Sequence, residues 1–265
     1  MDARDSDQKI RFFINIAHDI RTPLTLIKAP LNEIENEPLT DNGHSALTLA
    51  QRNTEKLLNM VTQLLDFQKI EREAMTLQVE ETEMAAFIGS AAGNFELLAR
   101  EKGINLHTQI SPEGEHLIFI DRRKVSLILD NLISNSIKYT CQHGNVWVKS
   151  SLADGKLILE VVDDGIGISA QAQKKLFNRF YRAENAANSK ETGSGIGLLL
   201  TKKMTLLHKG NIDFSSTEGV GTTFRIQLPV SPADYSKTEL IQIGFIASQK
   251  ATTMNENRKT TGTPL

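Results

Sequence analysis

The residues with the clearest chemical potential begin with one histidine near the N-terminus. His18 is followed by Asp19 and, four residues after the histidine, by Thr22. Two rows of apolar residues at seven-residue spacing flank it and predict a coiled-coil seam; they are Ile10, Ala17, Leu24 and Leu31, and Phe13, Ile20, Ile27 and Ile34. Because His18 falls one step past this seam, its imidazole is predicted to point toward solvent and to be available for chemistry. An ordinary surface histidine fits the same pattern, and Pro23 should bend the helix nearby.

A second group, Asn131, Asn135 and Lys138, recurs at spacings of four and three residues, which predicts one shared helix face. The core-facing positions beside it are Leu132, Ile133 and Ile137. Two neutral amide oxygens next to a cation suit a hydrated divalent metal that carries phosphate, because magnesium keeps most of its waters. By itself, a solvated polar face explains this group equally well.

A third group follows a β-branched strand, where Asp163 and Asp164 precede Gly165 and Gly167. The two glycines permit a tight turn and the close approach of a ligand. A partly buried Asp163 can accept a hydrogen bond from an exocyclic amine such as that of adenine, provided that its surroundings satisfy the carboxylate. An aspartate that merely forms a turn after the strand is the alternative.

The fourth group is glycine-rich and leads into an apolar helix. Gly193, Gly195 and Gly197 alternate with other residues before Leu198, so the first amides of the predicted helix can hold phosphate oxygens. The sixth position of a Rossmann fingerprint would be glycine but is Leu198, and the chain contains no Walker-type Gly-Lys-Ser/Thr sequence.

Composition sets broad bounds on the class of protein. The 265 residues favour about two domains, and the net charge of −2 gives no reason to expect nucleic acid as a partner. A single cysteine, Cys141, excludes an internal disulfide and suits a reducing compartment. The N-terminus lacks the apolar core of a signal peptide, and no run of about 18 apolar residues would span a bilayer. We expect a cytoplasmic segment without membrane contact, which could belong to a longer membrane protein.

Residues up to about 73 form the first predicted unit. A helix over about 7–37 meets the breaker cluster 38–43, and a second helix follows over about 44–73. One apolar stripe of this second helix contains Leu47, Ala50, Leu57, Val61 and Leu64, and Leu58 and Leu65 widen it. Because two helices have too little core, a dimeric antiparallel four-helix bundle made by two copies is the economical solution.

From about Met75 to Pro229 the pattern changes to mixed α/β. Helices are predicted at about 83–102, 122–139 and 195–209, and strands near 104–110, 117–121, 145–152, 156–163, 211–216 and 222–228. This order suggests one sheet with helices on one face. The stretch 164–194 is predicted to be a long functional loop with one helical turn around 174–180.

Taken together and in this order, these groups resemble the sensor histidine kinases of two-component signalling. Residues 18–24 look like the phosphoacceptor box, 131–139 the asparagine box, 163–167 and 193–197 the two glycine boxes, and 177–182 the phenylalanine box. Residues 219–224 resemble the closing glycine motif, so the likeness covers about 8–229.

The resemblance implies a homodimeric helical domain at 1–73, a linker at 74–80, an α/β-sandwich ATP-binding domain of the gyrase, chaperone and histidine kinase type at 81–230, and a tail or interdomain linker at 231–265. It implies ATP and Mg²⁺ as cofactors, with Asp163 reading adenine, Asn135 and Asn131 holding the metal and Lys138 contacting phosphate. The other implied nucleotide contacts are Tyr139, Gly165, Gly167, Ile168, Phe180, Arg182, Gly193, Ser194, Gly195, Ile196, Gly197, Leu198 and Thr222.

The implied reaction is attack of neutral His18 on the γ-phosphoryl group, which needs mainly positioning and charge neutralisation. Asp19 would orient the imidazole or take its proton. The phosphohistidine would pass its phosphoryl group to an aspartate of a response-regulator receiver, and Thr22 matches the position that helps to dephosphorylate the regulator in relatives.

The sequence departs from the family pattern in small ways. Asp19 replaces the commoner glutamate, and Ser136 stands where alanine is usual. The tail beyond Ser231 and the amino-acid sequence around His18 resemble the hybrid kinases of gut Bacteroides, in which a receiver domain would come next. The implied location is the cytosolic portion of an inner-membrane sensor.

Two other classes of protein remain as alternatives. One is an ATPase without a phosphohistidine, and the other is a catalytically silent dimerisation and docking module. The remaining histidines share no metal-ligand spacing and are predicted to be surface or packing residues; they are His44, His107, His116, His143 and His208.

Overall fold

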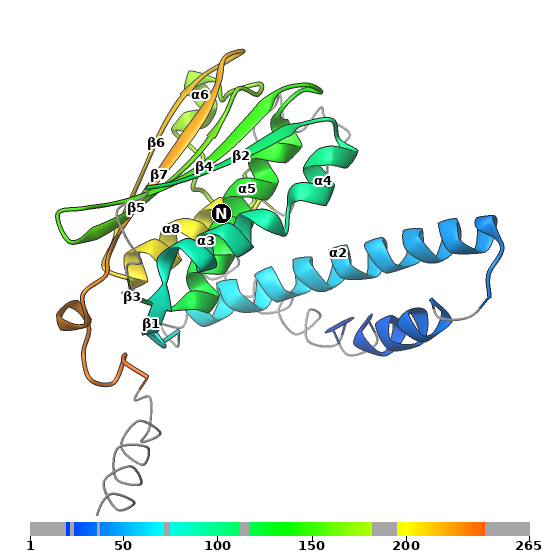
Figure 1. Cartoon of the computed structure of the whole chain (residues 1–265), viewed down its shortest axis with the longest axis horizontal. Coiled ribbons are helices and arrows are strands. Elements are labelled where there is room, and N and C mark those ends of the chain that lie inside the picture. The colour runs from blue at the N-terminus through cyan, green and yellow to red at the C-terminus, as the bar shows by residue number, and fades with distance from the viewer. Residues whose placement is uncertain are drawn as a thin grey trace, which may run out of the picture.

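The computed structural model describes residues 20–21, 24–35, 38–71, 75–111, 117–181 and 195–241. They form a helical hairpin that extends to one side of an α/β unit (Figure 1). No helix within these ranges is both long and apolar enough to cross a membrane. The α plus α/β fold class predicted from the sequence is confirmed.

The hairpin consists of a helical segment at 24–34 and the long helix α2 (Asp41–Glu71). The predicted breaker 38–43 is too long, because residues 41–43 already belong to α2. The hydroxyl of Thr40 accepts a hydrogen bond from the N–H of Gly43 at 3.2 Å and caps the helix. Asp41 then sits in the first turn, where a negative charge is favourable, so α2 starts three residues before the predicted His44.

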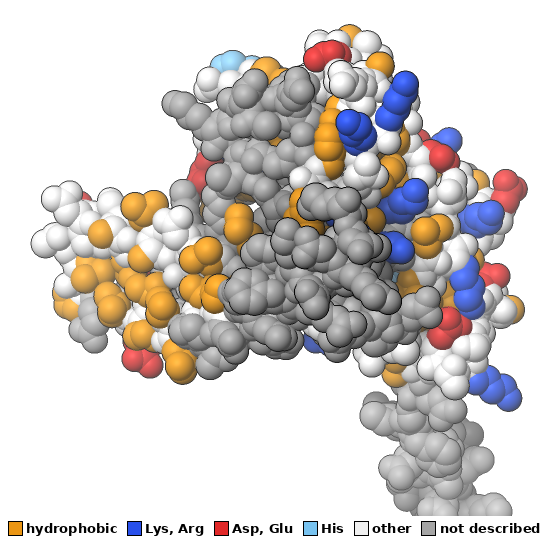
Figure 2. Space-filling view, turned by 180° about the vertical axis from the view of Figure 1, so that it is seen from behind, with side chains coloured by type: hydrophobic (Ala, Val, Ile, Leu, Met, Phe, Trp, Pro, Cys, Tyr) orange, Lys and Arg blue, Asp and Glu red, His pale blue; other side chains and the backbone are white. Residues whose placement is uncertain are grey.

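The two apolar rows of the first helix have different environments. Leu24, from the first row, packs against Val61 and Leu65 of α2 and is 8% exposed. Lys28 forms an ion pair with Glu55 across the hairpin at 2.9 Å. The described members of the second row are open, with exposed fractions of 41%, 48% and 42% for Ile20, Ile27 and Ile34. Apolar side chains therefore gather on the surface of the hairpin (Figure 2).

A five-stranded sheet with the order β2-β4-β5-β7-β6 forms the centre of the α/β unit. Its strands are β2 (Asn105–Ile110), β4 (Asn145–Ala153), β5 (Lys156–Asp163), β6 (Asn211–Thr217) and β7 (Gly221–Pro229). Only the β2–β4 pair is parallel in this sheet. The helices α3 (Met84–Gly93), α5 (Arg122–Tyr139) and α8 (Gly197–Leu207) lie on one face (Figure 1), as predicted.

The core lies between that sheet face and α5. Alternate residues of β4, β5 and β7 point inward, so Val148, Leu159 and Ile226 are at most 1% exposed. Ile133 and Ile137 of α5 face them and are fully buried. The predicted bounds of α5 are confirmed, and Asp121 caps its N-terminus by accepting the N–H of Lys124 at 3.1 Å.

Three further sequence predictions, all in the α/β unit, differ from the structure. The helix predicted over 83–102 is two helices, α3 and α4 (Glu96–Glu101), because Gly93 and Asn94 end the first. The strand β3 (Leu117–Ile120) is not part of the main sheet but pairs with β1 (Glu80–Glu83), which was not predicted. The helical turn expected at 174–180 begins earlier, as α6 (Ala170–Gln173), and is followed by turns.

The segments at the two sequence ends of the α/β unit, 77–79 and 235–241, lie against each other. The N–H of Val79 donates to the carbonyl of Glu239 at 2.7 Å, and the N–H of Ile241 donates to the carbonyl of Val79 at 2.8 Å. Tyr235 packs with Leu77 and Val79, and its hydroxyl donates to the carbonyl of Pro229 at 2.7 Å. Burial raises the Tyr235 pKa to above its usual range. The domain bounds at 73 and 230 stay predictions, but 235–241 pack against the linker.

A buried histidine fixes the same edge. His208 is fully buried at the end of α8, which agrees with its prediction as a packing residue. Its Nδ1 lies 2.9 Å from the carbonyl of Met204, so Nδ1 carries the proton, while Nε2 accepts the N–H of Asp121 at 3.3 Å. Both ring nitrogens are satisfied in the neutral form, and burial lowers the pKa of His208.

Replacing His208 with Gln should flatten the pH dependence of stability. The folded state disfavours the protonated ring. The stabilising contribution of the neutral His208 ring is therefore present above pH 6.5 and is lost as pH falls below that value. We expect H208Q to cost about 1–2 kcal/mol of unfolding free energy at neutral pH and to lose part of the acid slope. Urea unfolding between about pH 7.5 and 5 measures both. His44→Gln, at an exposed histidine, should keep the wild-type slope; an unchanged slope in H208Q would contradict the assignment.

Candidate functional site

Three of the four chemically suggestive groups converge at the C-terminal half of α5. Asn131, Asn135 and Lys138 lie half-buried along this helix. The N-terminus of α8 reaches the first of them, since a Cβ added to Gly197 would lie 2.7 Å from Oδ1 of Asn131. Nζ of Lys138 stands 4.8 Å from the ring centre of Tyr139. The asparagine group and the second glycine group, distant in sequence, therefore form one wall.

Asp163 closes the site from the end of β5. The residue is only 9% exposed. Oδ1 accepts the N–H of Gly165 at 3.1 Å, and Oδ2 accepts the hydroxyl of Ser136 at 3.0 Å. Burial raises the pKa of Asp163, and the hydrogen bonds from Gly165, Ser136 and the backbone of Thr222 oppose this shift. The surroundings thus satisfy the carboxylate, as its expected role requires.

The glycine turn after Asp163 packs against two other segments. A Cβ at Gly165 would lie 2.5 Å from the carbonyl of Tyr139, at the end of α5. Gly167 has a φ of +63°, and its Cβ would meet the carbonyl of Thr217. The N–H of Ile168 donates to the hydroxyl of Ser216 at 2.9 Å. The turn therefore joins α5 to the β6–β7 hairpin.

Phe180, at the end of the turns after α6, lies against Gly195 of the second glycine group. Gly195 has a φ of +69°, and an added Cβ would lie 2.8 Å from the backbone of Phe180. Ile196, directly before α8, is buried, and Leu198, in its first turn, is half-buried. Thr222 is 7% exposed, opposite Asp163 in the β5–β7 pairing.

Six predicted site residues lie outside the described ranges. They are His18, Asp19, Thr22, Arg182, Gly193 and Ser194. The bend expected at Pro23 also falls there.

Two polar contacts at the site were not predicted from the sequence. Ser136 was noted only as a departure from alanine, whereas its hydroxyl bonds to Asp163. Gln173 of α6 donates to the carbonyls of Ile168 and Ser216, at 2.8 and 3.0 Å, and so holds the start of the loop. A polar residue directly after Asn135 was a usable signal for the first contact, but nothing in the pattern pointed to Gln173.

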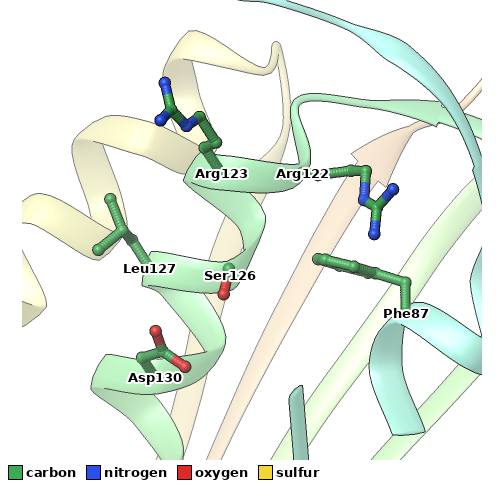
Figure 3. Close-up of a pocket in the computed structure, with 6 residues that line it drawn as sticks. All are labelled: Phe87, Arg122, Arg123, Ser126, Leu127 and Asp130. Atoms are coloured by element: carbon green, nitrogen blue, oxygen red, sulfur yellow. The ribbon is translucent and has the colours of Figure 1, made fainter. Parts of the chain in front are cut away.

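A second feature of α5 is a pocket of about 440 Å³ along its N-terminal half (Figure 3). Arg123, Ser126, Leu127 and Asp130 line it from that helix, and Arg122 stands over the ring of Phe87 from α3 at 5.6 Å. Burial raises the pKa of Asp130, against a hydrogen bond from Ser126. None of the predicted nucleotide contacts lines this pocket.

The donor set fits the magnesium ion that the resemblance implies. The described residues contain no cluster of three His, Cys, Asp or Glu side chains that would hold a metal by itself. Amide oxygens of Asn131 and Asn135 next to Lys138 match an ion that keeps its waters and is shared with phosphate.

Comparisons with known proteins agree with this geometry. Residues 8–73 match the His Kinase A (phospho-acceptor) domain, and residues 120–232 match the histidine kinase-, DNA gyrase B-, and HSP90-like ATPase family. The chain is 32% identical over 237 residues to histidine kinase P4 of Formosa agariphila, covering 88% of this chain and 17% of that protein. The chain belongs to the sensor histidine kinases.

Other histidine kinases show the same relation. Sensor histidine kinase WalK of Bacillus subtilis is 32% identical over 229 residues, which cover 84% of this chain and 37% of WalK. The chain thus spans well under half the length of these curated relatives. Among solved structures, full-length ShkA in complex with AMPPNP has a TM-score of 0.66 at 24% identity, covering 84% of this chain and 46% of that one. Histidine kinase AdeS of Acinetobacter baumannii has a TM-score of 0.56 at 21% identity, covering 81% and 98%. These two structures support the fold.

In this histidine kinase, Gly197→Ala should weaken ATP binding and also lower the free energy of unfolding. The new methyl group would lie 2.7 Å from Oδ1 of Asn131, so the asparagine or the helix start must shift. Such overpacking costs about 1–3 kcal/mol, and we expect roughly a tenfold loss of ATP affinity by calorimetry. Gly93→Ala is the matched control, because its Cβ meets nothing within 4 Å. Equal ATP affinity in G197A and G93A would contradict the assignment of this wall to the nucleotide.

Proposed function

We propose that this chain autophosphorylates on His18 with ATP and passes the phosphoryl group to an aspartate of a response-regulator receiver. The observation that carries the proposal is the convergence of Asp163, Asn131 and the α8 N-terminus on one site. The matches to a phosphoacceptor domain and an ATPase domain in the same chain support it. They favour it over the two alternatives, since an ATPase alone needs no phosphoacceptor and a silent scaffold needs no nucleotide site.

The side chains divide the work between binding and charge neutralisation. Asp163 accepts the exocyclic amine of adenine, and the first amides of α8 with Lys138 face the phosphates. Asn135 and Asn131 would hold magnesium, which supplies charge neutralisation on the phosphate oxygens. His18 attacks the γ-phosphorus in line, the bond to the β-phosphate oxygen breaks, and Asp19 orients the ring or takes its proton.

The names of relatives support a proposal for the wider setting of this chain. Hybrid signal transduction histidine kinase D of Dictyostelium discoideum matches 84% of this chain at 32% identity. We propose that a receiver domain, in the same polypeptide or in another, accepts the phosphoryl group from this chain. Autoinducer 2 sensor kinase/phosphatase LuxQ of Vibrio cholerae matches 86% at 29% identity. Its name supports regulator dephosphorylation as a second activity, for which Thr22 is the candidate. The proposed location is the cytosolic side of an inner-membrane sensor.

The proposed kinase activity is tested with γ-labelled ATP and magnesium. We expect acid-labile, base-stable label on the wild-type chain and a loss of at least roughly a hundredfold in His18→Ala, because phosphoryl transfer needs the positioned nucleophile. His107→Ala, at an exposed histidine of β2, is the control and should retain label. ATP hydrolysis unaffected by H18A would favour a plain ATPase, and absent nucleotide binding would favour the scaffold.

We further propose that the open row of the hairpin pairs with a second copy of the chain. Ile20, Ile27 and Ile34 remain over two-fifths exposed while Leu24 is buried within the hairpin. A continuous apolar row beside a closed one is what two hairpins need to form a four-helix bundle.

Ile27→Lys should therefore shift the chain from dimer to monomer. The lysine would place a charge in the paired row, where its desolvation is unfavourable, so we expect at least a roughly tenfold higher dimer dissociation constant in sedimentation equilibrium. Ala29→Lys is the control, because Ala29 is exposed two residues farther along the same helix, on its other side. Equal dissociation constants for I27K and A29K would exclude this face as the interface.

A further inference from the structure

The contact between Ser136 and Asp163 has no counterpart in the expected family pattern, where alanine is usual. The hydroxyl of Ser136 donates to Oδ2 of Asp163 at 3.0 Å, and the serine is 3% exposed. Ser136 directly follows Asn135 on α5, and its hydroxyl reaches Asp163 at the end of β5. A buried hydroxyl aimed at the carboxylate is therefore part of the site.

The carboxylate has few acceptor positions left. A carboxylate offers about four lone-pair sites. The N–H of Gly165 takes one on Oδ1, Ser136 takes one on Oδ2, and the backbone N–H of Thr222 adds a third donor. The hydroxyl of Thr222 lies 2.9 Å from that of Ser216. The three donors leave about one acceptor position for a ligand, and Ser136 helps to decide where it points.

The protonation state of Asp163 decides which purine it can read. As a carboxylate it only accepts hydrogen bonds and suits the 6-amino group of adenine, whereas a protonated acid would donate to a 6-oxo group. Burial raises the pKa of Asp163 and favours the acid, and the Ser136 hydrogen bond acts in the opposite direction. Asp164, the neighbouring charge, also raises that pKa.

We propose that Ser136 is a positioning residue for nucleotide specificity, which holds Asp163 as an oriented acceptor for the 6-amino group of the purine. This role rests on the proposed function, because it assumes that a purine nucleotide binds beside Asp163. It extends that function by adding Ser136, which acts on base recognition through its hydrogen bond to Asp163.

The test compares Ser136→Ala with Ser150→Ala. Ser150 of β4 is also buried, at 5% exposed, and its hydroxyl has no hydrogen-bond partner, so its loss controls for a missing buried oxygen. Affinities are measured by calorimetry for ATP, for purine riboside triphosphate, which lacks the amino group, and for inosine triphosphate, which carries a 6-oxo group. Thermal unfolding of both variants confirms that they fold.

We expect S136A to bind ATP roughly three- to tenfold more weakly while its affinity for purine riboside triphosphate stays within about twofold. Its preference for ATP over inosine triphosphate should fall by a similar factor, and S150A should match the wild type. An equal loss for all three nucleotides, or no loss for ATP, overturns the role of Ser136 while the proposed function stands. If the wild type binds none of the three, the proposed function itself falls, and this role with it.

Discussion

The buried carboxylate of Asp163 is the constraint on which the arrangement of the site depends. A charge that is only 9% exposed must be met by hydrogen-bond donors. Here they come from α5, from the turn after β5 and from β7, so these three segments must approach one another closely. That approach requires residues without side chains. A Cβ at Gly165 would lie 2.5 Å from the carbonyl of Tyr139, and one at Gly221 would collide with the carbonyl of Asp163. The polar requirement of one side chain thus explains two glycines far apart in the sequence.

A second buried acid fixes the other end of α5. Asp121 accepts the N–H of Gln78 at 2.8 Å and the ammonium of Lys124 at 2.6 Å, and its own N–H donates to His208. These contacts join the segment that precedes β1 to the end of α8. Because the N-terminus of α5 is anchored at Asp121 and the C-terminal half of α5 contacts Asp163, the fold holds the asparagine face of this helix in place. The site is therefore preorganised by interactions that lie at both ends of one helix.

The sequence predicts those parts of the molecule that depend on local pattern. The bounds of α5 follow from an aspartate cap and a 3.6-residue apolar period, and the glycine groups follow from spacing. What it does not predict are partnerships across the chain. The strand β1 reads Glu-Glu-Thr-Glu, which has low strand propensity, and it forms because β3 pairs with it. The break between α3 and α4 had a signal in Gly93 and Asn94 that the longer apolar pattern concealed. The partner of Ser136 depends on how α5 meets β5, which no local pattern encodes.

The α/β unit and the hairpin differ in how much apolar core each buries by itself. The α/β unit buries a continuous core between its sheet and its helices, with many side chains at 0–1% exposed. Among the described residues of the hairpin, the buried apolar cluster is small and consists of Leu24, Val61 and Leu65, whereas Ile20, Ile27 and Ile34 of the second row are exposed. Two hairpins that share their open rows would place two α/β units around one bundle. Which of these units then reaches a given histidine depends on the hand of the connection between the first helix and α2, because that connection sets the side on which α2 returns.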